Sequence, residues 1–212
     1  MTSRDKAIVH AGAGREWVNH LSHGIPGTTE AVFCLRPMSS ILLLSGSPST
    51  PSRSEAVLHH AAGILSDLGL TTQFVSVRDL PPEDLALAKF DSPQLKAIQQ
   101  KVAQATGIVI FAPVYKASYP GVLKALLDLL DQDAFTGKVI LPIATGGTLA
   151  HLLSIDFAMK PVLAVMGATH ILRGVYILSS QIQLDAAGTL QLEADIEERL
   201  RAGLQALAQA VK

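Results

Sequence analysis

Residues 38–46 read Met-Ser-Ser-Ile-Leu-Leu-Leu-Ser-Gly, a short apolar run that stops at a cluster of Gly, Ser and Pro. A run of this kind, bounded by turn residues, is typical of a buried β-strand, here 41–45. The following segment, 54–68, carries its apolar residues at helical spacing, and Gly69 is well placed to end the helix. The alternation of strand and helix therefore begins at this point of the chain.

The same alternation continues to the end of the sequence. The pattern predicts further strands at 71–77, 107–112, 138–144 and 173–179, and helices at 93–105, 121–130, 149–166 and 193–211. We expect a long loop over 81–92, Ser92 as the cap of the helix that starts at Pro93, an interruption or a bend near Pro161 and a turn at Gly188. Five apolar strands alternating with helices predict a parallel sheet covered by helices on both faces.

Residues 1–37 differ from the rest, because they contain scattered Gly, His and Thr without a sustained period. We expect them to be a poorly ordered N-terminal extension, and residues 38–212 to form the working domain. The extension could instead pack as an irregular arm or extend a dimer contact.

Composition excludes several classes of function. Hydrophobic residues make up 49% of the 212 residues and the formal net charge is −1, so the chain can bury a sizeable core but has no basic cluster for nucleic acid. No apolar run reaches the roughly 18 residues of a membrane span. The single cysteine, Cys34, is compatible with a cytoplasmic location, and the seven dispersed histidines lack the spacing of a metal site.

Ligands of an open parallel sheet bind beyond the carboxyl ends of the strands, where the strand order reverses. The connections after the first, third and fourth predicted strands should therefore form any site, and they are the most unusual sequences in the chain. We call them the serine loop (45–54), the tyrosine loop (112–121) and the glycine loop (144–151).

The serine loop reads Ser-Gly-Ser-Pro-Ser-Thr-Pro-Ser-Arg-Ser and joins a buried strand to a helix. Hydroxyl groups and the free N–H groups of a helix start can surround a phosphate. The loop lacks the Gly-Lys-Ser/Thr end of a P-loop and the G-x-G-x-x-G of a Rossmann fold. It predicts an anion cradle, with an ordinary serine-capped connection as the alternative.

The tyrosine loop holds Tyr115 and Tyr119, two of the three tyrosines in the chain. A flat aromatic ligand packs well against such side chains and exposed backbone, although both tyrosines could instead be packing residues.

The glycine loop contains Gly146 and Gly147, which allow the backbone to approach a ligand closely. Their amides could bond the pyrimidine edge of a flavin, or the glycines could simply serve a tight turn. We expect His151, one turn into the next helix, to be structural.

Together these loops resemble the NADPH-dependent FMN reductase family of the flavodoxin-like superfamily, in particular the flavin reductases of two-component alkanesulfonate monooxygenase systems. The matching stretches are 44–54 (Leu-Ser-Gly-Ser-Pro-x-x-Pro-Ser-Arg-Ser), 112–119 (Ala-Pro-Val-Tyr-Lys-Ala-Ser-Tyr), 123–130 and 145–151. The resemblance covers about residues 38–212. It implies a three-layer sandwich whose five parallel strands have the order 2-1-3-4-5.

The resemblance also implies an FMN site built from all three loops. Its positions are Ser45, Ser47, Ser52, Arg53 and Ser54 around the phosphate, Pro113, Val114, Tyr115 and Lys116 beside the ring, and Thr145, Gly146 and Gly147 at the other edge. Tyr119 matches a tyrosine that lies on a π-helical bulge at the subunit interface of the sulfonate-linked reductases and is associated with flavin release. In this sequence Pro120 follows it, where those reductases often have Ser.

The activity implied is hydride transfer from NADPH, or from NADH, to FMN by a homodimer or homotetramer. Reduced FMN would pass to a partner monooxygenase, and no side chain need act as nucleophile, since the chemistry belongs to the cofactors. One alternative is a quinone, azo or chromate reductase with bound FMN. Another is a non-enzymatic flavodoxin-type carrier, which the near-neutral charge and the Gly-Gly loop disfavour.

Overall fold

The computed structural model describes residues 15–20, 32–37, 39–185 and 188–212, in two compact units, Met1–Met38 and Ser39–Lys212. In the first unit, β1 (Arg15–His20) pairs antiparallel with β2 (Val32–Pro37). The sequence pattern did not indicate these two strands. The remainder of the predicted extension lies outside the described residues, so the expectation of poor order stays a prediction.

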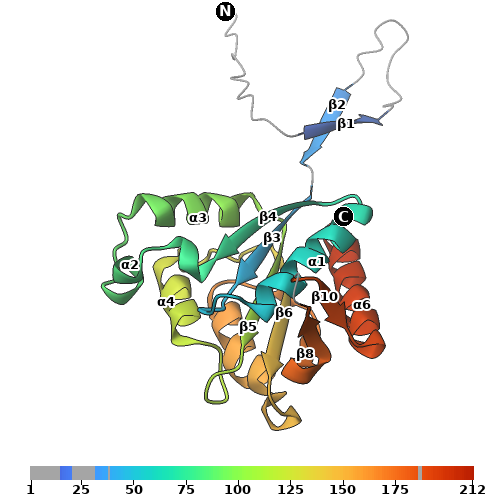
Figure 1. Ribbon diagram of the computed structural model, residues 1–212. Coiled ribbons are helices and arrows are strands. Elements are labelled where there is room, and N and C mark those ends of the chain that lie inside the picture. Colours follow the sequence, from blue (N-terminus) through green and yellow to red (C-terminus); the bar gives the residue numbers. More distant parts are fainter. Residues whose placement is uncertain (1–14, 21–31, 38, 186–187) are drawn as a thin grey trace, which may run out of the picture. The chain divides into compact units, whose positions relative to one another are not determined.

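A six-stranded parallel sheet forms the centre of the second unit (Figure 1). Its strands are, in spatial order, β4 (Thr71–Ser76), β3 (Ser40–Ser45), β5 (Gly107–Pro113) and β6 (Val139–Gly146), with β7 (His170–Ile171) and β8 (Val175–Leu178) both paired to β6. The predicted order 2-1-3-4-5 is confirmed, with the fifth place shared by β7 and β8. The sequence pattern predicted one continuous strand, 173–179, at this place.

Helices cover both faces of the sheet, and the alternation of side chains along each strand explains why. In β3, Ile41 and Leu43 pack with helices α1 (Arg53–Asp67) and α6 (Ala194–Ala210). Leu42 and Leu44 face the opposite layer, formed by α3 (Pro93–Gln104), α4 (Gly121–Leu129) and α5 (Lys160–Val165). Since both faces are buried, the strand is apolar at every core position rather than at alternate ones.

The segment 149–166, predicted as a helix that is interrupted or bent near Pro161, consists of three short pieces. They are a 3₁₀ turn η2 (Leu149–His151), a π-helical turn η3 (Ile155–Met159) and α5. Pro161 lies in the first turn of α5, where its missing N–H group costs nothing. An α-helix running through this proline would lose one of its hydrogen bonds, so the regular helix begins at Lys160.

The sequence pattern also did not predict several smaller elements. The predicted loop 81–92 contains α2 (Pro82–Ala86), which follows a 3₁₀ turn η1 (Val77–Asp79). After the turn η4 (Ser179–Gln181), strands β9 (Ile182–Leu184) and β10 (Leu190–Leu192) form an antiparallel hairpin.

Two local predictions have different outcomes. Gly188 lies in the hairpin connection with a φ of 81°, as a turn glycine should. Ser92 occupies the N-cap position of α3, but its hydroxyl donates to Oε1 of Gln94 (3.2 Å) and makes no cap bond. None of the helices in the described part of the chain has the length and apolar character needed to cross a bilayer.

Candidate functional site

The three loops meet at the carboxyl edge of the sheet, because β3, β5 and β6 are adjacent parallel strands. A cavity of about 460 Å³ opens at this edge. Its lining residues come from the serine loop, the tyrosine loop, the glycine loop and the segment after β8: Ser47, Ser49, Pro51, Ser52, Arg53, Ser54, Pro113, Tyr115, Thr145, Ser179 and Leu184. Of the predicted site residues, Ser45, Val114, Lys116, Gly146 and Gly147 are not part of this lining.

The hydroxyl groups of the serine loop hold the loop in shape. Ser45 is fully buried, and its Oγ donates to Oε1 of Glu55 (3.1 Å) and accepts the N–H of Ser47 (3.4 Å). Oγ of Ser47 accepts the N–H of Ser49 (3.3 Å), and Oγ of Ser52 caps α1 by accepting the N–H of Glu55 (3.3 Å). The serine loop is therefore a serine-capped connection, as the alternative prediction had it, and it also lines a polar cavity.

The first turn of α1 supplies the donors that a phosphate requires. Arg53 is exposed, whereas Ser54 is buried, and both line the cavity. The first N–H groups of a helix lack partners within the helix and form the positive end of its dipole. A guanidinium, hydroxyls and free amides at one end of a cavity fit the terminal phosphate of FMN.

The tyrosine loop folds back on itself at Lys116 and Ala117, whose φ values of 51° and 64° lie in the left-handed region. The backbone groups of Tyr115 and Ser118 bond to each other in both directions, at 2.7 and 3.1 Å. Oη of Tyr115 lies 3.5 Å from Oγ of Ser49, so the tyrosine and serine loops meet at the cavity that both line. Lys116 is exposed at the tip of the turn.

The structure corrects the position expected for Tyr119. This residue is not on a π-helical bulge but in a non-helical segment before α4, half-buried against the core of that layer. Pro120, with φ −61°, is the N-cap of α4 and has no N–H group, so the helix starts after it. The π-helical turn of the described chain is η3. Burial raises the pKa of Tyr119, with Lys124 opposing and Asp128 adding to the rise.

The glycine loop is supported from β8. A Cβ atom at Gly146 would lie 2.2 Å from Oη of Tyr176, so only glycine fits there without a shift. The same hydroxyl donates to the carbonyl of Thr148 (2.7 Å), and burial raises the pKa of Tyr176. Thr145 reaches the cavity, with Oγ1 3.4 Å from Oγ of Ser179.

Sequence reasoning missed Ser49, Pro51, Ser179 and Leu184 among the lining residues. Ser179 ends the predicted fifth strand, and parallel strands end at a common edge, so the same argument that selected the three loops could have included it. Leu184 lies in β9, which had no recognisable pattern.

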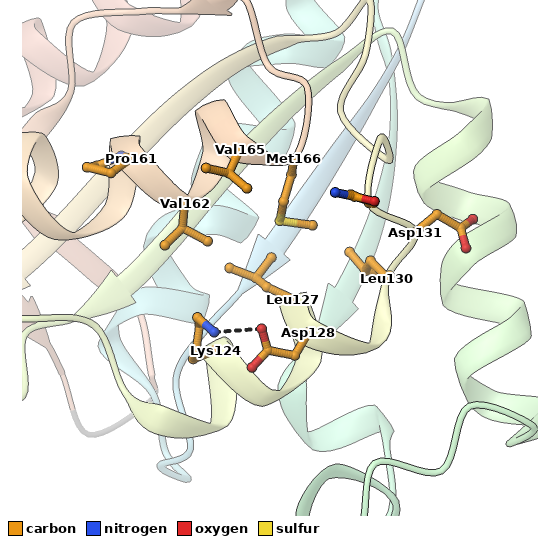
Figure 2. A pocket seen from close by; sticks show the side chains of 10 residues that line it. Lys124, Leu127, Asp128, Leu130, Asp131, Pro161, Val162, Val165 and Met166 are labelled. Atoms are coloured by element: carbon orange, nitrogen blue, oxygen red, sulfur yellow. Dashed lines mark hydrogen bonds and ion pairs between the residues drawn. The ribbon is translucent and has the colours of Figure 1, made fainter.

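A second cavity, of about 440 Å³, lies between α4 and α5 and differs in chemistry (Figure 2). Leu127, Val162, Val165 and Met166 contribute apolar side chains, and Lys124 forms an ion pair with Asp128 (2.6 Å) at its border. Because its lysine is already paired and the first turn of α5 presents Pro161 and Val162 to it, this cavity does not fit a phosphate as the first cavity does.

The fold and the first cavity define a class. An open parallel sheet with a phosphate-type loop at the point where strand order reverses is the arrangement of flavodoxin-like nucleotide-binding proteins. Residues 39–183 match the family model of NADPH-dependent FMN reductases. The chain belongs to this family, and it is an oxidoreductase that uses FMN and NAD(P)H.

Individual relatives agree with this assignment. The chain is 44% identical over 171 residues to FMN reductase (NADPH) of Escherichia coli (strain K12), a match that covers 81% of this chain and 89% of that protein. It is 46% identical over 167 residues to FMN reductase (NADPH) of Pseudomonas putida, covering 78% and 84%. The crystal structure of an NADH:FMN oxidoreductase (EMOB) in its apo form superposes with a TM-score of 0.74 at 34% identity, covering 82% and 90%.

Proposed function

We propose that this FMN reductase takes FMN into the cavity at the β3–β5–β6 edge as an exchangeable substrate and supplies reduced FMN to a partner monooxygenase, in sulfonate desulfonation. The observation that carries the proposal is the polarity of this cavity. One end has the donors of the serine loop and α1, and the other is lined by Pro113 and the exposed Tyr115 of the tyrosine loop and by the buried Thr145 of the glycine loop.

Within this proposal, the lining residues divide by chemistry. Ser47, Ser52, Arg53 and Ser54 bind the phosphate, together with the first amides of α1. Pro113, Tyr115 and Thr145 lie beside the ring.

The other predicted positions support the loops. Ser45 anchors the serine loop through Glu55. The N–H of Val114 donates to the carbonyl of Thr145 (2.7 Å) and ties β5 to β6 at the edge, while Gly146 packs against Tyr176. Lys116 and Gly147 are exposed, and their contact with the ring remains a prediction from the resemblance.

Bound FMN supplies the hydride-accepting atom, and NAD(P)H supplies the hydride. The contribution of the chain is to bind and orient. The guanidinium of Arg53 and the hydroxyl of Ser54 would hold the phosphate, and Pro113, Tyr115 and Thr145 would lie beside the ring. A side chain acting as nucleophile is unnecessary for this chemistry, so activity depends on positioning.

The apolar surface of 149–165 supports a homo-oligomer, either a homodimer or a homotetramer. Leu149, Leu153, Phe157 and Val165 are exposed by 61%, 52%, 77% and 76%, which is unusual for large hydrophobic side chains so close in sequence. A second copy of the chain would remove this surface from water. Light scattering of the wild type and of Phe157→Glu tests this, with a smaller assembly expected for the variant.

The main experiment is steady-state NADPH and NADH oxidation with FMN varied, combined with the flavin content of the purified chain. We expect saturation with added FMN, little retained flavin and faster turnover with NADPH. A flavin-saturated preparation that reduces a quinone by ping-pong kinetics would instead indicate a reductase with permanently bound FMN.

Tyr119 tests the release step separately. We expect Tyr119→Ala to retain FMN more tightly and to lose transfer to the monooxygenase, whereas Tyr119→Phe, which keeps the buried ring, behaves as the wild type. Unchanged flavin content and unchanged transfer in Tyr119→Ala would exclude this role.

A further inference from the structure

Glu55, in the first turn of α1, is the common acceptor of a hydrogen-bonded cluster that does not line the cavity. Oε1 accepts the hydroxyls of Ser45 (3.1 Å) and Ser76 (2.9 Å), and Oε2 accepts the guanidinium of Arg78. The side chains of Glu55 and Arg78 are 15% and 33% exposed. The carboxylate thus ties the ends of β3 and β4 to the 3₁₀ turn η1.

A chain of hydrogen bonds connects this cluster to the cavity wall. Oγ of Ser45, bonded to Glu55, accepts the N–H of Ser47, and Oγ of Ser47 accepts the N–H of Ser49. Both Ser47 and Ser49 line the cavity. Movement of the Glu55 carboxylate would therefore be passed to the polar end of the cavity through three bonded serines.

The charge of Glu55 matters as much as its hydrogen bonds. The residue follows Arg53 and Ser54 directly in the first turn of α1, so its carboxylate lies within one helical turn of the proposed phosphate donors. A carboxylate there would repel a phosphate dianion unless a cation balances it, and partial burial limits screening by salt. Arg78 is that cation.

We infer that the Glu55–Arg78 pair determines how strongly this chain prefers FMN to riboflavin, because Arg78 cancels the negative charge behind the serine loop while Glu55 holds the loop through Ser45. The inference rests on the proposed FMN site. Both residues are positioning residues, since neither lines the cavity.

The test measures dissociation constants of FMN and of riboflavin with the full chain, by quenching of flavin fluorescence. Arg78→Met leaves a net charge of −1 at the pair and is expected to weaken FMN binding about tenfold, with riboflavin unchanged within about twofold. Glu55→Gln leaves +1 and strengthens FMN binding. The double variant is neutral and returns the ratio of the two constants toward that of the wild type.

The order of the FMN-to-riboflavin ratios among the four proteins distinguishes an effect of charge from an effect on the conformation of the serine loop. If the pair only maintains the loop, both single variants weaken FMN binding and the double variant does not recover, which would overturn the inference, as would an unchanged ratio in Arg78→Met. The differences should shrink at high salt. A wild type that does not bind FMN would instead contradict the proposed site.

Two further variants keep the test decisive. Arg78→Lys retains the cation and should preserve the wild-type ratio, whereas Arg78→Gln removes the cation and replaces Arg78→Met if that variant fails to fold. Arg201→Met removes the same charge from the ion pair of Arg201 with Glu197 (2.6 Å) on α6, and its residues do not line the cavity. It should leave the FMN-to-riboflavin ratio unchanged.

Discussion

The serine loop and the glycine loop leave the same edge of the sheet but are stabilised differently. In the serine loop, Ser45, Ser47 and Ser52 accept N–H groups only two or three residues away. In the glycine loop, the carbonyl of Thr148 is held by the hydroxyl of Tyr176, 28 residues away in the sequence. The serine loop is held by short-range bonds within itself and by the adjacent Glu55, whereas the glycine loop depends on a side chain from β8.

This difference matches two requirements of the proposed site. A phosphate is bound best by donors that are already fixed, because ordering them on binding costs free energy. The ring must remain accessible to a nicotinamide nucleotide, and residues 147–151 are exposed. The contrast predicts that changes in the glycine loop affect stability through β8, and that changes in the serine loop affect phosphate binding.

The largest expected effect is that of Gly146→Ala. The new Cβ would lie 2.2 Å from Oη and 3.2 Å from Cζ of Tyr176, so the ring must move and its bond to Thr148 is lost. We expect a loss of about 2–3 kcal/mol in the free energy of unfolding, measured in urea, as is usual for overpacking.

Two variants sharpen this prediction. Adding Tyr176→Phe removes the oxygen of the closest contact and should recover part of the loss. Gly147→Ala is the matched control, because its Cβ would meet nothing within 4 Å and stability should be unchanged. Wild-type stability in Gly146→Ala would mean that the glycine loop does not depend on β8.

Arg53→Met tests the serine loop. Arg53 is exposed, so we expect unchanged stability but FMN binding weaker by about tenfold, or about 1.4 kcal/mol, with riboflavin unaffected. Lys96→Met removes a cation from an exposed position of α3 and is the control, because Lys96 does not line the cavity. Equal effects of the two substitutions would argue against a specific phosphate site.

Ser52 has two roles that can be separated. Ser52→Ala removes the cap of α1 and should cost about 1 kcal/mol of stability. Ser52→Asp keeps a cap acceptor but places a carboxylate at the cavity, so stability should persist while FMN binding is lost. Thermal unfolding and fluorescence titration distinguish these outcomes. Retained FMN binding in Ser52→Asp would show that the phosphate does not bind beside Ser52.

The comparison also explains what could be predicted from the sequence. Strands such as 41–45 and the composition of the serine loop are local properties, and the strand order 2-1-3-4-5 followed from the family resemblance. The support of Gly146 by Tyr176 is a contact between distant residues, which leaves no periodic pattern. The segment 149–166 has helical spacing along its whole length, but only the part from Lys160, with Pro161 in its first turn, is a regular α-helix, and a 3₁₀ turn and a π-helical turn precede it.

The smallest expected effect concerns alkaline pH. Burial raises the pKa of Tyr176 and of Tyr119 above the ordinary value near 10, so the unfolded chain loses these protons first as pH rises. The folded state then binds more protons than the unfolded state, so stability decreases as pH rises above about 10. Below that pH both states are protonated, and the stability is fully present and does not change with pH through these groups.

Tyr176→Phe and Tyr119→Phe should each reduce this alkaline loss of stability, measured as the melting temperature between pH 8 and pH 11. Ionisation of Tyr176 removes the donor to Thr148, so the glycine loop should loosen before the serine loop, whose support is provided by hydroxyls that do not titrate in this range. An alkaline slope identical in Tyr176→Phe and the wild type would show that this tyrosine does not carry the effect.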